Sequence, residues 1–439
     1  MEWWVFLLAF FGILMTFMFI GIPVAFSFLA VNFIFVTYIM GFKSGMNQLV
    51  LSAYDSLAQF SLTTIPLFVL MGELLLHSGM VVRTLDVMSK WLGKLPGRLS
   101  ILSVISGSLF ASLSGSSIAN TSMLGSLLVP DMRKRGYHKG MILGPIMASG
   151  SLAVVMPHSS AAILMGSLGK ISIGELLIAT IVPGILMSIF FIVYIVIACL
   201  RNPSLAPKYE VEEADRRDRF NSLVVGVLPM VILIIGTIAL IFFGIATPTE
   251  SAGLGALGAL LLVIAYKQFK KDVMVKAIKG TLHITGMVAI IIAASSAFSQ
   301  LLSFTGATRE LIKIAVSLPV PPLLIIGIML IIVVILGSLI EAFGTMMLTI
   351  PIFIPMVLAM HFDPVWFGIL MLICIDMGNL APPFGLLLFV MKGVAPKEVT
   401  MQDIYKSIIP FISVEALIVI LIMLVPTIAL WLPRLIVSQ

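Results

Sequence analysis

Charged residues are scarce in this sequence. Of its 439 residues, only 10% are Asp, Glu, Lys or Arg, whereas 60% are hydrophobic. Soluble domains carry about 25% charged residues, so the composition excludes an ordinary water-soluble protein. Apolar runs of about 20 residues, each long enough to cross a hydrocarbon core, recur along the chain. We therefore expect a multi-pass membrane protein whose main solvent is the lipid bilayer.

The residues and motifs of the common catalytic classes are also missing. The two cysteines, Cys199 and Cys374, lie in separate apolar runs without metal-ligand or disulfide spacing. The sequence has no Walker motif, no nucleophile–base pair and no metal-ligand cluster. The formal net charge of +6 comes from basic residues in short loops beside apolar segments, so it does not indicate nucleic-acid binding. We predict that the protein is not an enzyme.

Ten apolar segments predict membrane-spanning helices. They lie at about residues 3–21, 24–42, 62–82, 140–166, 175–200, 222–244, 247–266, 281–302, 365–391 and 404–430. Two more apolar segments, 99–132 and 322–360, are interrupted near their middle by Gly, Ser and Thr. Each of these two is either a pair of spans or a re-entrant hairpin.

The distribution of basic residues favours the hairpins. With two hairpins and ten spans, 21 of the 26 Lys and Arg residues fall on one side of the membrane. The positive-inside rule makes that side cytoplasmic and places both termini in the periplasm. If either interrupted segment crossed the membrane fully, every later loop would change sides and the bias would disappear. We therefore predict an all-α protein of the bacterial inner membrane.

The two halves of the chain predict an inverted repeat. Gly79, Gly115 and Gly150 of the first half are followed 227 to 229 residues later by Gly306, Gly344 and Gly378. Residues 1–200 and 222–439 each contain five predicted spans and one hairpin, and a charged linker at 201–221 joins them. An odd number of spans per half inverts the second copy. Inverted repeats with broken helices are typical of secondary transporters, whose sites lie where the breaks meet.

The tip of the first hairpin is unusually polar for its depth. Residues 112–121 include six hydroxyl or amide side chains, which are costly in a membrane unless they line a polar cavity. Gly115 permits a sharp reversal there. The reversal exposes carbonyl groups suited to Na⁺ and helix N-terminal N–H groups suited to an anion. Two helices packed through small residues are the alternative.

The tip of the second hairpin contains a single carboxylate, Glu341. An isolated charge at this depth is unfavourable unless a cation or hydrogen bonds neutralise it. Glu341 therefore acts either near a sodium ion or through a buried hydrogen bond that fixes the tip. Both interpretations remain open from the sequence.

Two of the predicted spans are also interrupted. One contains Gly150–Ser151 and then Pro157, and the other contains Gly378–Asn379 and then Pro382–Pro383. Proline frees backbone carbonyls, so both breaks are expected to line a cavity rather than face lipid. From the tips and breaks together we predict substrate contacts at Ser116, Ser117, Pro157, His158, Ser159, Gly344, Thr345, Pro382 and Pro383.

These segments resemble one transporter family across nearly the whole chain. The Ser-Gly-Ser-Ser tip at 114–117, the Thr-Pro-Thr-Glu helix start at 247–250, and the Gly-Ser-Leu and Pro-Pro-Phe-Gly breaks look like the large membrane subunit of tripartite ATP-independent periplasmic (TRAP) transporters. One departure is His158, where the family usually has a second proline after Pro157.

The resemblance implies an elevator-type Na⁺ symporter that takes up a carboxylate such as sialic acid or a C4-dicarboxylate. It implies two partners, a small four-helix membrane subunit and a periplasmic substrate-binding protein. It also implies two sodium ions. One would lie near Ser114, Gly115, Ser116, Asn120, Gly150 and Ser151, and the other near Ser338, Glu341, Gly344, Thr345, Gly378 and Asn379.

We accordingly expect two domains. Residues 99–166 and 322–391 would form a mobile transport domain, and the remaining spans, with amphipathic arms at 44–60 and 267–280, would form a scaffold. A stand-alone divalent-anion/sodium symporter has a similar repeat and is the nearest alternative. An ion channel or an integral-membrane enzyme is a more distant one.

Overall fold

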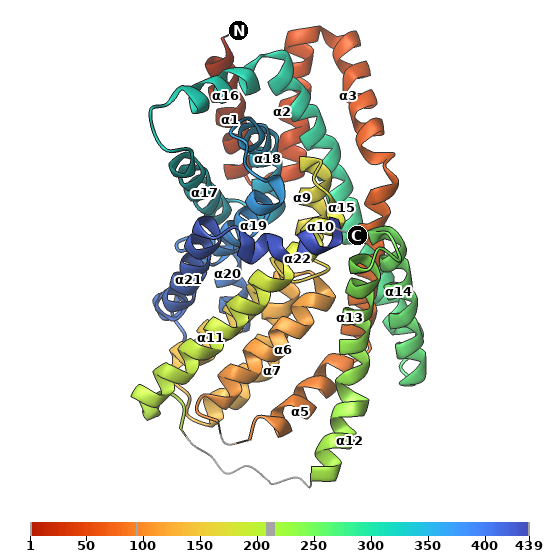
Figure 1. The fold of residues 1–439 in the computed structure, drawn as a ribbon, viewed down its shortest axis with the longest axis vertical. Coiled ribbons are helices and arrows are strands. Elements are labelled where there is room, and N and C mark those ends of the chain that lie inside the picture. Colours follow the sequence, from red (N-terminus) through yellow and green to blue (C-terminus); the bar gives the residue numbers. More distant parts are fainter. Residues whose placement is uncertain (1, 94, 208–215, 438–439) are drawn as a thin grey trace.

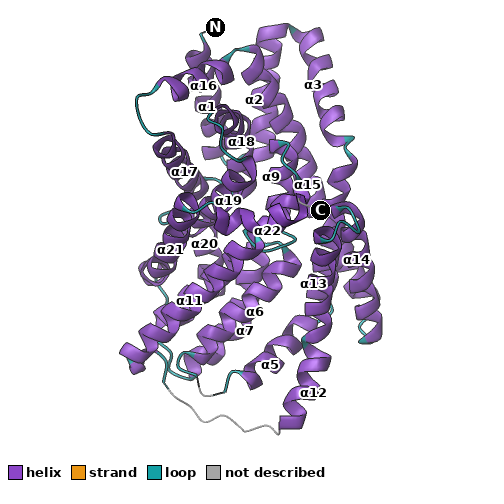
Figure 2. Cartoon of the chain, viewed as in Figure 1, coloured by secondary structure: helices purple, strands orange, loops and turns teal. Residues whose placement is uncertain are grey.

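The computed structural model describes residues 2–93, 95–207 and 216–437, and all regular elements in these ranges are helices (Figures 1 and 2). The N-terminus and α1 lie at the upper end of the view in Figure 1, and helices α5 and α12 lie at the lower end. This confirms the predicted all-α class.

The first half of the chain supplies helices α1 to α11. They are α1 (Trp3–Phe19), α2 (Val24–Met40), α3 (Phe42–Leu57), α4 (Thr64–His77), α5 (Met80–Trp91), α6 (Arg98–Ser114), α7 (Ser117–Lys134), α8 (Lys139–Ser151), α9 (Ser160–Gly169), α10 (Ile173–Ala179) and α11 (Ile181–Arg201). Short 3₁₀ turns occur at Phe60–Thr63, Leu152–Val154 and Pro203–Leu205.

The second half supplies helices α12 to α22. They are α12 (Arg216–Gly226), α13 (Leu228–Phe242), α14 (Pro248–Ala265), α15 (Lys271–Phe304), α16 (Ala307–Ser317), α17 (Pro322–Leu339), α18 (Ala342–Ala359), α19 (Pro364–Leu380), α20 (Leu386–Val394), α21 (Met401–Leu424) and α22 (Thr427–Val437).

Both interrupted segments fold as two helices joined by a very short turn. Helices α6 and α7 meet at Gly115, whose φ of +57° is in the left-handed region that favours glycine. Helices α17 and α18 meet at Ile340–Glu341. The two pairs have the same construction at equivalent places in the two halves.

The helices that precede the hairpins also match between the halves. Helix α5 begins after Gly79 with φ +75°, and α16 begins after Gly306 with φ +73°.

The predicted helix start at 247–250 is confirmed as well. The Thr247 side chain accepts from the Glu250 backbone N–H, and the Glu250 side chain accepts from the Thr247 backbone, which forms a capping box before α14.

The two interrupted spans are broken where the sequence placed the breaks. Helix α8 ends at Ser151 and continues through a 3₁₀ turn before α9 begins at Ser160. Helix α19 ends at Leu380 and α20 begins at Leu386, with a cis peptide bond between Pro382 and Pro383. Both breaks occur in the middle of long apolar segments.

Helix packing separates two groups of elements. Helices α2, α3, α4, α13, α14 and α15 pack mainly among themselves, whereas α6, α7, α8, α17, α19 and α20 form the second group. Helices α11 and α21 pack principally on α6, α8 and α19. This differs from the predicted division, which assigned 175–200 and 404–430 to the scaffold. The buried face of α21 includes Ile404, Ile408 and Phe411 and packs on the second group. We call the second group, which contains both hairpins, the hairpin group.

Seven helices in the described residues are long and apolar enough to cross a membrane. Helices α17 and α18, the two arms of the second hairpin, are among them. Further apolar helices of 10–17 residues include α1, α2, α6 and α19.

The predicted arms and linker differ in detail from the structure. Helix α3 is separate, but the arm predicted at 267–280 is continuous with the following span in the 34-residue helix α15. The predicted linker at 201–221 includes residues 208–215, which lie outside the described residues, and its end is already helical from Arg216. Gly280 lies at this junction, and the helix continues through it.

Candidate functional site

The two hairpin tips and the two helix breaks meet around one cavity of about 590 Å³. The first tip contributes Gly115 to Ala119, and the second contributes Glu341 to Phe343. The breaks contribute Val154, Ser160, Ala161, Asn379, Leu386 and Leu387. Helices α4 and α15 of the other group close the cavity with Glu73, Gly280, His283, Ile284 and Met287. The cavity therefore lies between the two groups of helices.

Four helix N-termini converge on this cavity. Its lining includes first-turn residues of α7, α9, α18 and α20. Ser116 caps α7 by accepting from the Ala119 N–H at 3.3 Å, and Ser159 caps α9 by accepting from the Ala162 N–H at 3.2 Å. Helices α18 and α20 have no side-chain cap. Helix N-termini carry positive partial charge and unpaired N–H groups, which together suit an anion.

The residues predicted for the first sodium ion do lie together. The Asn120 amide nitrogen donates to the carbonyls of Gly107 at 2.9 Å and Ser149 at 3.1 Å, which ties the hairpin to α8. Thr121 packs directly on Gly150, where a Cβ atom would overlap the Thr121 hydroxyl. The Ser160 hydroxyl donates to the Gly115 carbonyl at 3.2 Å.

Two oxygen atoms in this region are buried without a partner in the described chain. They are the Asn120 Oδ1 and Thr121 Oγ1 atoms. Buried oxygen atoms normally accept a hydrogen bond or coordinate a cation. Sodium is a hard cation that favours such oxygen ligands, so the donor set at the first tip fits it.

The residues predicted for the second sodium ion are split. Glu341 and Asn379 line the cavity. Thr345 is buried behind the tip, and the Thr345 hydroxyl donates a hydrogen bond to the Glu341 carbonyl at 3.3 Å. Gly344 faces Val24 of α2, and Gly378 approaches the backbone of Gly337. Ser338 is half-buried, and its hydroxyl donates to the Ile335 carbonyl. The Asn379 Oδ1 atom is buried without a partner, as on the first side.

Of the nine predicted substrate contacts, only Ser116 and Ser117 line this cavity. Pro382 and Pro383 lie on the surface of the α19–α20 break, where the Pro383 carbonyl accepts from the Tyr405 hydroxyl at 3.0 Å. Pro157, Ser159 and Thr345 are buried behind the cavity wall, and Gly344 is buried against α2.

His158 has an internal role in this conformation. Its Nδ1 lies 3.0 Å from the Ser112 carbonyl, and its Nε2 lies 2.9 Å from the Thr237 hydroxyl of α13. Because a carbonyl only accepts, Nδ1 carries the proton, and in the neutral ring Nε2 accepts from Thr237. The ring also packs on Phe68 of α4 at 4.5 Å between centroids. His158 therefore joins the first hairpin to both α4 and α13 rather than reaching the cavity.

Sequence reasoning did not identify the cavity wall on α15 or the apolar contacts at α20. Glu73 lies 3.1 Å from His77, packs over Gly280 and lines the cavity. Sequence reasoning also did not discuss Asp376 and Glu415, two fully buried acids in α19 and α21. An acid within an apolar span was the signal that marked them.

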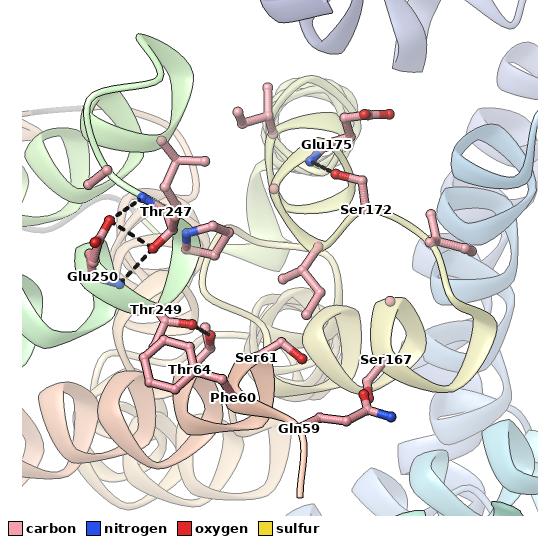
Figure 3. Close-up of a pocket in the computed structure, with 18 of the residues that line it drawn as sticks. Gln59, Phe60, Ser61, Thr64, Ser167, Ser172, Glu175, Thr247, Thr249 and Glu250 are labelled. Atoms are coloured by element: carbon pink, nitrogen blue, oxygen red, sulfur yellow. Dashed lines mark hydrogen bonds between the residues drawn. The ribbon is translucent and has the colours of Figure 1, made fainter. Parts of the chain in front are cut away.

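A second cavity of about 760 Å³ lies around the start of α14 (Figure 3). Its lining includes the Thr247–Glu250 capping box, Thr64 of α4 and the turn before α10. The Thr64 and Thr249 hydroxyls are 2.7 Å apart, and the Ser172 hydroxyl accepts from the Glu175 N–H. No predicted sodium or substrate residue lines it.

The family of this chain follows from its sequence as a whole. The model of the tripartite ATP-independent periplasmic transporter family, DctM component, matches residues 11–428. The chain belongs to this family. It is therefore a multi-pass membrane transporter component and not an enzyme. The match also favours the tripartite system over the stand-alone symporter and the channel.

Curated TRAP relatives match along almost their full length. The sialic acid TRAP transporter large permease protein SiaM of Vibrio cholerae is 27% identical over 95% of this chain and 96% of its own. The C4-dicarboxylate large permease protein DctM of the same organism is 27% identical over 96% of each chain. The 2,3-diketo-L-gulonate large permease protein YiaN of Escherichia coli is 27% identical over 95% of this chain and 97% of its own.

Two solved transporters share the fold of this TRAP chain. YdaH of Alcanivorax borkumensis aligns with a TM-score of 0.59 at 14% identity, over 89% of this chain and 90% of its own. MtrF of Neisseria gonorrhoeae aligns with a TM-score of 0.59 at 14% identity, over 87% of this chain and 84% of its own. At this identity the likeness concerns the fold alone.

Proposed function

We propose that this TRAP subunit carries out sodium-coupled uptake of a small organic anion, and that the cavity between the two helix groups is its substrate site. The observation that carries this proposal is the convergence of the α7, α9, α18 and α20 N-termini on one cavity. No Lys or Arg side chain lines that cavity, so the helix termini are the source of positive potential among the described residues. An anion can bind there through backbone N–H groups.

The substrate class follows from the relatives. Those named for sialic acid, C4-dicarboxylates and 2,3-diketo-L-gulonate all have organic acids in their names. We propose that this chain likewise carries a carboxylate. Its partners would be a small membrane subunit and a periplasmic substrate-binding protein, as the word tripartite in the family description supports.

Sodium is the proposed driving ion. The Asn120, Thr121 and Asn379 oxygens supply unpartnered ligands on both sides of the cavity, and Glu341 supplies a carboxylate at the second tip. A cation bound at these positions reduces the repulsion between Glu341 and an anionic substrate. The ions and the anion therefore stabilise each other's binding, which is the basis of symport.

We propose an elevator movement of the hairpin group against the scaffold within a ten-span inverted repeat. Glu73, Gly280 and His283 line the cavity close to the predicted cytoplasmic ends of α4 and α15. The cavity in this structure would then open to the cytoplasm. We propose that both termini lie in the periplasm. For the N-terminus this agrees with the basic segments beside α5 and α12, which lie at the opposite end of the molecule (Figure 1).

Reconstitution tests this function directly. In proteoliposomes that contain all three components, uptake of the organic acid bound by the partner protein should follow an inward Na⁺ gradient. The Asn120→Ala variant should weaken apparent Na⁺ affinity by about tenfold, because it removes an oxygen ligand, and a lost polar contact to a charged group costs about 1.5 kcal/mol. Ser126→Ala removes an exposed hydroxyl on the same helix and serves as the control. Equal uptake with K⁺ in place of Na⁺, at constant pH and voltage, would refute sodium coupling.

A further inference from the structure

Charge is unevenly distributed around the cavity between the two helix groups. The N-termini of α7, α9, α18 and α20 supply positive partial charge at the hairpin tips and the helix breaks. The wall that α4 and α15 form contributes the carboxylate of Glu73 instead. Among the described residues, no Lys or Arg lines the cavity. One part of the cavity therefore attracts an anionic group, whereas the α4–α15 wall repels one.

The Glu73 carboxylate is held in place by contacts with two helices. Its Oε2 atom lies 3.1 Å from the Nε2 atom of His77, one turn later in α4. It also packs on Gly280 of α15, where a Cβ atom would overlap the carboxyl group. Glu73 is half-buried, and the contact with His77 engages one of its two carboxylate oxygen atoms. The other oxygen atom can accept hydrogen bonds from a ligand.

The α4–α15 wall offers no buried cation of the described chain to a second carboxylate. His283 is the one basic side chain that lines the cavity there, and it is exposed to water, which screens its charge. His77 contacts Glu73 and does not line the cavity. The proposed sodium ions would lie at the hairpin tips, where one of them offsets the charge of Glu341. A second carboxylate on a ligand would therefore lie against Glu73.

The serine hydroxyls of the lining also favour a ligand that donates hydrogen bonds. The Ser117 hydroxyl donates to the Ser151 carbonyl at 3.5 Å, and the Ser160 hydroxyl donates to the Gly115 carbonyl at 3.2 Å. Each hydroxyl has a single hydrogen atom, so the oxygen atoms of Ser117 and Ser160 remain as acceptors for a ligand. Together with Glu73, they give the cavity acceptors that a plain dicarboxylate cannot satisfy.

We propose that the cavity binds an anion with one carboxylate and several hydrogen-bond donors, such as the hydroxyl groups of a sugar acid, and that Glu73 rejects a second carboxylate. The single carboxylate would bind at the helix N-termini, and the hydroxyl groups would donate to Glu73 and the serines. A like charge against Glu73 is the repulsive element that gives specificity. This inference narrows the carboxylate class of the proposed function and rests on the cavity being the substrate site.

Three six-carbon acids test these features separately. Gluconate has one carboxylate and five hydroxyl groups, glucarate has a second carboxylate in place of the terminal hydroxymethyl group, and hexanoate has no hydroxyl group. Thermal unfolding of the purified full-length chain in detergent, at constant Na⁺ concentration and ionic strength, measures the apparent Kd of each acid, because a ligand of the folded state raises the midpoint. Gluconate should bind more tightly than glucarate by about tenfold or more, because like charges brought together are unfavourable. Hexanoate should also bind more weakly than gluconate.

A variant of Glu73 identifies the residue that rejects the second carboxylate. Glu73→Gln removes the charge at nearly constant volume, and its amide can donate to a carboxylate. In this variant, the difference in Kd between gluconate and glucarate should fall to about twofold, because the repulsion is lost. Glu398→Gln, which changes an exposed carboxylate paired with Arg133 outside the cavity, should keep the wild-type difference.

Each outcome bears on a different part of the proposal. Equal binding of gluconate and glucarate by the wild-type chain, or an unchanged difference in folded Glu73→Gln protein, overturns the rejection by Glu73. Hexanoate binding as tightly as gluconate overturns the need for donors. The wild-type comparisons decide both points even where the variant does not fold. If none of the three acids raises the midpoint, the cavity is not an anion site, and the proposed function fails with this inference. Gluconate binding without sodium-driven uptake contradicts only the proposed coupling.

Discussion

His158 joins the two groups of helices that the proposed elevator movement would separate. His158 is 3% exposed, and its backbone φ is +67°. Its ring forms hydrogen bonds with the Ser112 carbonyl on one side and the Thr237 hydroxyl on the other. A non-glycine residue at this φ is strained, and such strain persists only where neighbouring contacts compensate for it. In an elevator cycle, the contact between His158 and α13 has to break. The contact is therefore specific to this conformation.

The Thr237 contact gives a prediction at the residue scale. Thr237→Val removes the hydroxyl that donates to His158 at nearly constant volume, so it should destabilise this conformation by about 1 kcal/mol. A shift of that size changes the ratio of two conformations by roughly fivefold. Spin labels on α13 and α7 should report the shift as a redistribution of distances. Thr281→Val, whose hydroxyl donates only within its own helix to Ala277, is the control. Identical distributions for both variants would contradict the prediction.

Single residues also show what the sequence could establish about the site. The unusual density of hydroxyl and amide groups at 112–121 predicted the first tip, and the structure places that tip at the cavity. Pro157, His158 and Gly344, which were predicted to contact substrate, do not line the cavity, because a break in a helix does not specify which side of it faces the cavity. That choice depends on how α2, α4 and α13 pack, which is long-range information.

At the scale of elements, close backbone packing holds the hairpins against the broken spans. Gly378 of α19 approaches Gly337 of α17 so closely that a Cβ atom would lie 2.7 Å from the Gly337 backbone. On the other side, a Cβ atom on Gly107 would meet the Ser149 side chain of α8. Small residues permit this approach between membrane helices, where packing replaces the hydrophobic effect.

Gly378→Ala should therefore destabilise the protein. The obstructing atoms belong to the backbone and cannot rotate away, so we expect a loss of about 1–3 kcal/mol from overpacking. Gly327→Ala in α17, where a Cβ atom meets nothing within 4 Å, is the matched control and should be neutral or slightly stabilising. Thermal unfolding in detergent measures both. Equal midpoints for the two variants would show that α17 and α19 do not pack this closely.

The sequence predicted elements better than it predicted their grouping. Hydrophobic segments and proline or glycine interruptions located the hairpins and both broken spans, because these features are local. The assignment of α11 and α21 required knowledge of which apolar face meets which neighbour. Glu415 was the missed indication, since a fully buried acid in the apolar helix α21 indicates that this helix packs within the protein, where it contacts α8 and α19.

At the scale of the whole molecule, the two groups of helices meet around the cavity and where α4 packs on α6 and α15 packs on α18. Their contacts also include His158 with Thr237 and Gly344 with Val24. In the proposed movement, one group slides past the other as a rigid body, which is a general route to alternating access. In the proposed cycle, the site itself changes from one side of the membrane to the other in this way.

The accessibility of the first hairpin tip from each side of the membrane tests this movement. A single cysteine at Ser116, in a chain with Cys199→Ser and Cys374→Ser, should react with a membrane-impermeant thiol reagent. In the conformation described here, it should react only from the side at which Gly280 and His283 lie, which we assign as cytoplasmic. With Na⁺ and the loaded binding protein present, labelling from the periplasmic side should appear, while the cysteine-free chain stays unlabelled. Labelling of Ser116→Cys from one and the same side under every condition would contradict the moving site.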